Sequence, residues 1–94
     1  MSINVIVEIR AKAGHEPAIR KILEELVPSV RKEDGCESYL LYVDRANPAV
    51  FYTYESWSSD AQLTKHIDGV KSLIGQVLPM LEGAPKITPL DHLV

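Results

Sequence analysis

The sequence predicts an α+β fold in which four strands and two helices follow one another in the order βαββαβ. Three observations predict it. Short segments rich in β-branched and aromatic residues have the composition of strands, and the first also alternates with a period of two. Two longer segments repeat apolar residues at the spacing of an amphipathic helix. Glycine, proline and asparagine stand between these segments, where turns are needed.

The first strand and the first helix are predicted from their apolar spacing. In the segment Ile3–Arg10, β-branched residues stand at every second position: Ile3, Val5, Val7 and Ile9. Gly14 breaks this alternation. From Glu16 onward, apolar residues three and four apart predict a helix: Ile19, Ile22, Leu23, Leu26, Val27 and Val30. Pro28 lies inside this helix and removes one backbone donor, so we expect a kink near residues 24–27.

The middle of the chain is predicted to be a hairpin. The segments 36–43 and 50–57 are both rich in strand-forming residues. The turn residues Asp44-Arg45-Ala46-Asn47-Pro48 directly follow the first segment. Two strands joined by so short a turn pair in antiparallel fashion.

The second helix is predicted to begin at a capping box made by Ser59 and Gln62. We expect this helix to bend or break at Gly69 and to resume from Val70 through an apolar stripe that ends near Leu81. Gly83 and Pro85 then stop it, and residues 86–90 form a short last strand.

The order βαββαβ is the ferredoxin-like arrangement, a four-stranded antiparallel sheet with both helices on one face. Its other face is expected to be apolar too, because the strand 50–57 places large residues on both sides. A sheet that is apolar on both faces is covered on both, and a second copy of the chain is the cover available. The sequence therefore predicts a homodimer with sheets face to face.

Composition indicates one domain spanning residues 1–94, with 46% hydrophobic and 24% charged residues and a mean hydropathy of -0.03. The net charge of -3 and the absence of a basic run disfavour a nucleic-acid partner. No apolar run is long enough to span a bilayer, and the first residues do not resemble a signal peptide, so we expect no membrane partner and a cytoplasmic protein. The single cysteine, Cys36, rules out an internal disulfide.

Four segments together resemble the antibiotic biosynthesis monooxygenase domain family, and within it the small quinol monooxygenase-like members: 5–10 with Gly14, 27–36, 54–59 and 63–66. This resemblance covers nearly the whole chain. It implies a dimeric α+β barrel with a hydrophobic cavity in each subunit. It also implies oxidation of a small aromatic phenol or quinol by O2 with no metal, flavin or other cofactor.

Two residues are the candidate catalytic bases. Glu55 shares a strand face with apolar neighbours by the period-two rule, and a carboxylate in such a place suits the removal of a phenolic proton. The alternative is a structural carboxylate that accepts hydrogen bonds. For His66, the resemblance places this part of the second helix beside the cavity, and the alternative is a structural or surface histidine.

Five further residues are candidate substrate-binding residues. Phe51 and Trp57 are predicted to line the cavity with the faces of their rings, and Thr53 shares their strand face. The resemblance places Leu63 beside the cavity, where some polyketide-oxidising relatives carry a tyrosine, which argues against such substrates. Asn4 on the first strand points either into the cavity, where it binds a substrate oxygen, or toward a partner chain.

The function favoured by these observations is a cofactor-independent monooxygenase. Direct reaction of triplet O2 with a closed-shell molecule is spin-forbidden, so the substrate itself must become a one-electron donor, as a deprotonated quinol is. Two alternatives stay open. One is an isomerase-type enzyme acting on a small phosphorylated signal molecule, with Arg10 or Lys65 as the phosphate contact. The other is a dimeric barrel that only binds an apolar small molecule. No spacing typical of a metal site is present.

Overall fold

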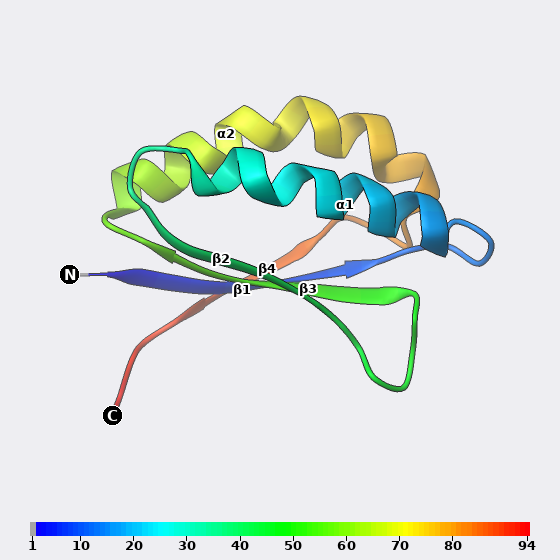
Figure 1. The fold of residues 1–94 in the computed structure, drawn as a ribbon, viewed down its shortest axis with the longest axis horizontal. Helices are drawn as coiled ribbons and strands as arrows, with labels where there is room; N and C mark the ends of the chain where they lie inside the picture. The colour runs from blue at the N-terminus through cyan, green and yellow to red at the C-terminus, as the bar shows by residue number, and fades with distance from the viewer. Residues whose placement is uncertain (1) are drawn as a thin grey trace.

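The computed structural model describes residues 2–94 and has both helices on one face of a four-stranded antiparallel sheet (Figure 1). The order along the chain is β1 (Ile3–Arg10), α1 (Glu16–Arg31), β2 (Cys36–Val43), β3 (Val50–Trp57), α2 (Asp60–Val77), a 3₁₀ turn η1 (Leu78–Met80) and β4 (Lys86–Leu90). In the sheet the order is β2-β3-β1-β4. The predicted ferredoxin-like α+β fold is therefore confirmed, and each of the four strands lies where the sequence predicts it.

The register of the sheet decides which side chains face the helices. Val5 of β1 pairs with Glu55 of β3, and Glu55 also pairs with Tyr39 of β2. Directly paired residues point to the same face of a sheet, so these three side chains form one row across three strands. All three are buried beneath the helices.

Helix α1 packs against the sheet through the predicted apolar stripe, of which Ile19, Val27 and Val30 are buried. The helix runs from Glu16 to Arg31 across Pro28, so the proline does not end it. The kink expected near residues 24–27 stays a prediction.

Helix α2 begins as predicted, with the Ser59 side chain accepting a hydrogen bond from the backbone N–H of Gln62 at 3.3 Å. The expected break at Gly69 is wrong, because the helix is continuous from Asp60 to Val77, whereas the alternative of a bend there stays a prediction. Glycine keeps its backbone N–H, so it weakens a helix by only about 1 kcal/mol and need not interrupt it. The helix instead gives way to η1 at Leu78, next to Pro79, whose nitrogen carries no hydrogen.

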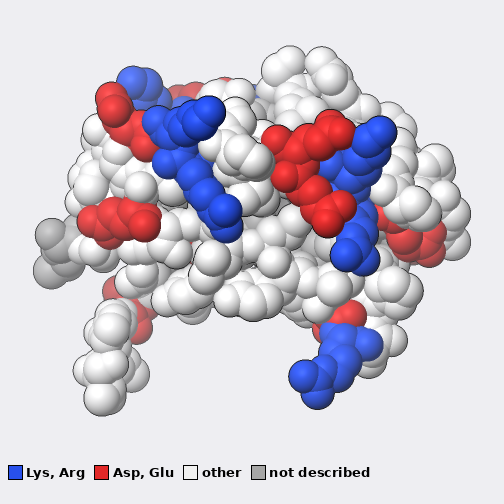
Figure 2. All heavy atoms as spheres, in the orientation of Figure 1, with Lys and Arg blue, Asp and Glu red and all other residues white. Residues whose placement is uncertain are grey.

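The face of the sheet opposite the helices is open. In Figure 1 the β2–β3 turn and the C-terminal tail both project on this side, away from the helices. Exposed apolar side chains on the open face are those of Leu40, Tyr42, Tyr54 and Leu90. Figure 2 shows charged side chains of both signs over the helices, whereas the band below them is mostly uncharged.

Within residues 2–94, no helix combines the length and the apolar character that crossing a bilayer requires.

Candidate functional site

A cavity lies between the sheet and the two helices. It offers about 90 Å³ to the centre of a water-sized sphere, which is room for more than one water molecule. All but four of the residues that line it are apolar: Val5, Val7, Ile9, Ile19, Ile22, Leu23, Leu26, Leu63, Ile67, Val70, Leu73, Ile74, Val77, Pro85 and Ile87. The cavity is therefore suited to an apolar molecule.

Helix α2 forms one wall of this cavity and adds few buried side chains to the core. Among its residues only His66 is buried, whereas α1 buries three apolar side chains. The apolar face of α2, which includes Val70, Leu73 and Ile74, lines the cavity and is only partly buried. This face is the surface that a ligand would cover.

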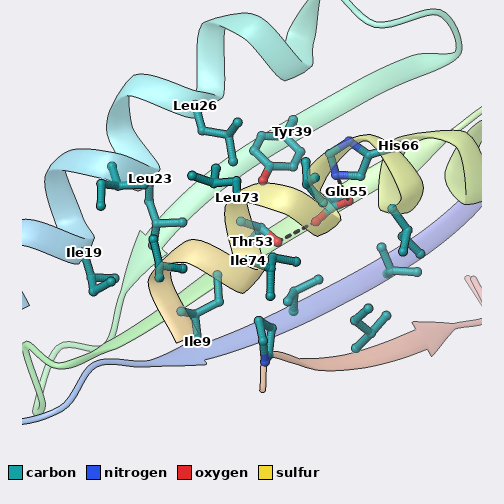
Figure 3. A pocket seen from close by; sticks show the side chains of 18 of the residues that line it. Ile9, Ile19, Leu23, Leu26, Tyr39, Thr53, Glu55, His66, Leu73 and Ile74 are labelled. Atoms are coloured by element: carbon teal, nitrogen blue, oxygen red, sulfur yellow. Dashed lines mark hydrogen bonds and ion pairs between the residues drawn. The ribbon is translucent and has the colours of Figure 1, made fainter. Parts of the chain in front are cut away.

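The four polar residues of the cavity gather at one end of it. They are Tyr39 from β2, Thr53 and Glu55 from β3, and His66 from α2 (Figure 3). In the close view, the Tyr39 hydroxyl and the Glu55 carboxylate both point toward the interior, while Ile9 and Ile19 lie toward the opposite end. One end of the cavity can thus make hydrogen bonds, and the remainder can only pack.

Glu55 is the centre of this polar cluster, and its side chain is buried to 4% exposure. The Thr53 hydroxyl donates a hydrogen bond to Glu55 Oε2 at 2.6 Å, and the Trp57 indole N–H donates to Glu55 Oε1 at 3.0 Å. Two donors compensate a buried carboxylate for part of the hydration that it loses. The same two bonds fix the orientation of the carboxyl group against the cavity.

His66 is held between two carboxylates and two aromatic rings. Its Nδ1 lies 3.0 Å from Glu33 Oε1 and 3.1 Å from Glu33 Oε2, and its Nε2 lies 3.8 Å from Glu55 Oε1. The Trp57 ring stacks on the imidazole with 4.6 Å between centroids, and Tyr39 meets its edge at 5.9 Å. The ring therefore has one acidic neighbour at each nitrogen.

Tyr39 supplies a neutral hydroxyl at the same end of the cavity. Burial away from water raises the pKa of the Tyr39 phenol, and the nearby charges of Glu55 and Glu33 raise it further. The hydroxyl thus keeps its proton at physiological pH and can donate it in a hydrogen bond. Burial also raises the pKa of the Cys36 thiol, which does not favour a nucleophilic role.

The structure brings together four of the seven candidate residues, since Thr53, Glu55, Leu63 and His66 all line the cavity. Phe51 and Trp57 are buried in the core and do not line it, although Trp57 contacts both Glu55 and His66.

Of the two positions that the sequence leaves open for Asn4, the cavity and the side of a partner chain, the structure excludes the cavity. Asn4 pairs with Ser56 and Leu90, whereas its neighbour Val5 faces the helices. Successive side chains of a strand point to opposite faces, so Asn4 belongs to the open face of the sheet.

Sequence reasoning missed two residues of the site. Tyr39 had a usable signal, because a hairpin with Asp44 opposite Val50 pairs Tyr39 with Glu55. Glu33 had no such signal. It lies in the turn after α1, and it meets His66 only because the chain folds back over 33 residues.

Within residues 2–94, no group of three or more histidine, cysteine, aspartate or glutamate side chains is arranged to hold a metal ion. The donor set of the cavity offers one carboxylate, one imidazole and two hydroxyls.

Comparisons with known proteins show similarity in both sequence and fold. Residues 2–69 match the family model described as antibiotic biosynthesis monooxygenase. The protein described as probable quinol monooxygenase YgiN from Escherichia coli (strain K12) is 35% identical over 75 residues, which are 69% of this chain and 72% of that protein.

Solved structures are similar over nearly the whole chain. PA3566 from Pseudomonas aeruginosa is 33% identical with a TM-score of 0.88, covering 99% of this chain and 95% of its own. Rv0793 from Mycobacterium tuberculosis is 25% identical with a TM-score of 0.89, covering 100% of this chain and 97% of its own.

Proposed function

Because this chain belongs to the antibiotic biosynthesis monooxygenase family, we propose that it oxidises a small aromatic quinol or phenol with O2 in the cavity between sheet and helices. One observation carries the proposal: a buried carboxylate, Glu55, stands at the polar end of an otherwise apolar cavity. The similarity to a probable quinol monooxygenase supports a quinol in particular.

The reaction needs no prosthetic group if the substrate supplies all the electrons. A quinol QH2 and O2 give a hydroxyquinone and water. Two of the four electrons come from conversion of quinol to quinone, and two come from conversion of a ring C–H bond to a C–O bond. The O–O bond breaks, and its second oxygen leaves as water. The protein has to produce the quinol anion, which is the species that gives an electron to O2.

The cavity suggests how the substrate lies. Its reacting hydroxyl faces Glu55, which removes the proton as the general base, with Thr53 and Trp57 holding the carboxylate in place. The Tyr39 hydroxyl donates a hydrogen bond to the resulting oxyanion. The aromatic rings lie along the apolar walls, where Leu63 and other α2 side chains cover them.

A phosphorylated substrate fits this cavity poorly. No lysine or arginine is among the residues that line it. Neither basic residue considered for a phosphate contact, Arg10 or Lys65, reaches the cavity, and Arg10 pairs with Glu8 at 3.1 Å. A phosphate dianion beside Glu55 would be repelled without a compensating cation.

The oligomer in this proposal is a homodimer. The open face of the sheet carries the exposed apolar side chains of Leu40, Tyr42, Tyr54 and Leu90. A second copy of the chain would cover them. The β2–β3 turn and the C-terminal tail, which both project on this side in Figure 1, would then reach around the partner.

The test of function is O2 consumption on a panel of reduced quinols and naphthols, comparing the parent with Glu55→Gln and His66→Ala. Loss of the general base should lower kcat by about 10²-fold to 10⁴-fold. The loss should shrink as pH rises above the pKa of the substrate, because the quinol then arrives already ionised.

Exposed Glu24, which pairs with Arg20 on α1, provides the matched control, and Glu24→Gln should keep the parent rate. A loss that is equal at every pH would assign Glu55 to positioning or stability. Binding of quinols without O2 consumption would favour the small-molecule-binding alternative.

A further inference from the structure

Three ionisable side chains connect the polar end of the cavity to the protein surface. The side chain of Glu55 is 4% exposed, that of His66 is 6% exposed, and that of Glu33 is 36% exposed. His66 stands between the two carboxylates, with Nε2 toward Glu55 and Nδ1 toward Glu33. An imidazole with an acidic partner at each nitrogen can accept a proton at one nitrogen and release one from the other.

The proposed reaction requires a connection of this kind between the cavity and solvent. The inference rests on that proposed function. A hydroxyquinone is a vinylogous carboxylic acid, so it leaves as an anion at neutral pH. The balance is then QH2 + O2 giving Q–O⁻ + H2O + H⁺, and one proton per turnover must reach solvent. The base that receives the substrate proton is buried in a cavity with mostly apolar walls, so the proton needs a route.

We propose that Glu33 is the solvent end of a proton path that runs from Glu55 through His66. Glu55 takes the proton of the substrate hydroxyl and passes it to His66 Nε2. His66 then gives the proton on Nδ1 to Glu33, which releases it to water. Glu33 does not line the cavity, so it acts on the reaction only through His66 as a positioning residue.

Backbone hydrogen bonds hold Glu33 in place for this role. Its N–H donates to Val30 O at 3.0 Å, and its carbonyl accepts from the Cys36 N–H at 3.1 Å. The Ser58 N–H donates to Gly35 O at 2.8 Å, which joins the same turn to the connection between β3 and α2. The turn therefore holds the Glu33 backbone at a place from which its carboxylate reaches His66.

The two links of the path differ in length. The contact between His66 and Glu33 is a hydrogen bond at 3.0 Å, whereas the 3.8 Å between His66 Nε2 and Glu55 Oε1 is longer than a hydrogen bond. Catalytic hydrogen bonds are often long without substrate and tighten in the complex. A carboxylate only accepts hydrogen bonds, so the proposed path puts the ring proton on Nδ1 and leaves Nε2 to accept.

The groups of β2 that face this cluster do not compete for the proton. Burial raises the pKa of both the Tyr39 phenol and the Cys36 thiol, so both groups stay protonated at neutral pH. Trp57 covers one face of the imidazole by stacking. Around His66, the two carboxylates are thus the groups among residues 2–94 that exchange its protons.

The kinetic test compares Glu33→Gln with the exposed control Glu24→Gln. We expect Glu33→Gln to lower kcat by about 10-fold to 100-fold, less than direct loss of the base, with KM changed by less than about twofold. The solvent deuterium isotope effect on kcat should rise, because proton release becomes slow. In Glu33→Ala, formate should restore kcat in a concentration-dependent manner, since this site is open to solvent.

A parent-like kcat in Glu33→Gln would overturn the inference, as would a loss without an isotope effect and without formate rescue. A second measurement does not depend on turnover. Ring ¹⁵N signals of His66 should show the proton on Nδ1 in the parent and a shift toward Nε2 in Glu33→Ala. An unchanged tautomer would refute the role of Glu33, whereas failure of every quinol to consume O2 would refute the proposed function.

Discussion

At the scale of single residues, the site depends on which side chains share the inner face of the sheet. The period-two rule placed Glu55 and Thr53 on the face with the cavity, and the structure has both there. The rule does not reach Tyr39, which needs the register of the hairpin, or Glu33, because a turn residue has no periodicity. For Asn4 the sequence allows either face, and the burial of its neighbour Val5 beneath the helices puts Asn4 on the open face.

Tyr39 leads to a prediction about stability at alkaline pH. Burial, followed by the charges of Glu55 and Glu33, raises the pKa of this phenol in the folded protein above its unfolded value of about 10. The unfolded chain therefore loses the Tyr39 proton first, and the stability that this group contributes below pH 10 is lost as pH rises further.

Urea unfolding between pH 8 and pH 11 measures this effect. Substitution Tyr39→Phe removes the titrating group, so the free energy of unfolding should fall less steeply above about pH 10 than in the parent. The control is Tyr42→Phe, which removes a phenol from an exposed position of the same strand. Parallel curves for the parent and Tyr39→Phe would contradict the prediction.

At the scale of elements, the sequence predicts every strand, because the composition of the strands and the turn residues between them agree. It failed inside α2, where Gly69 suggested a break. Local propensity favours a break there by only about 1 kcal/mol, and the hydrogen bonds of the flanking turns outweigh it. The spacing of apolar residues in α2 does not show which of them line a cavity and which pack in a core, because both kinds of position are apolar.

The two glycines at positions 35 and 69 should respond in opposite ways to alanine. A Cβ at Gly69 would meet nothing within 4 Å, so Gly69→Ala should raise the free energy of unfolding by about 0.5 to 1 kcal/mol. At Gly35 the φ angle is +81°, and a Cβ would lie 2.5 Å from Gln62 Cγ. Gly35→Ala should therefore destabilise the fold by at least about 1 to 2 kcal/mol.

Urea denaturation of both variants checks this pair. Because Gly35 belongs to the turn that holds Glu33, its variant should also disturb the His66 contact, whereas Gly69→Ala should not. Destabilisation by Gly69→Ala would show that α2 needs the freedom of a glycine at this position.

At the scale of the whole molecule, the family resemblance noted in the sequence is confirmed by the family model and by a curated relative. The dimer stays a prediction. Its physical basis is the apolar face of the sheet that the helices leave uncovered. Two helices cover one face of a sheet whose other face carries aromatic and aliphatic side chains. A domain of this size buries too little apolar surface to leave such a face in water at no cost.

Light scattering at micromolar concentration should give twice the 10.5 kDa mass of one chain. Tyr54 lies on the open face with 41% of its surface exposed in the single chain, so Tyr54→Lys should leave the fold intact. In a dimer built on the open face, the same substitution would bury one unpaired charge from each subunit in the interface, which should shift the protein toward monomer. The matched control is Ser72→Lys on exposed surface of α2, which adds equal charge and should stay dimeric. A parent protein that remains monomeric, or a Tyr54→Lys variant that remains dimeric, would show that the open face is not the interface.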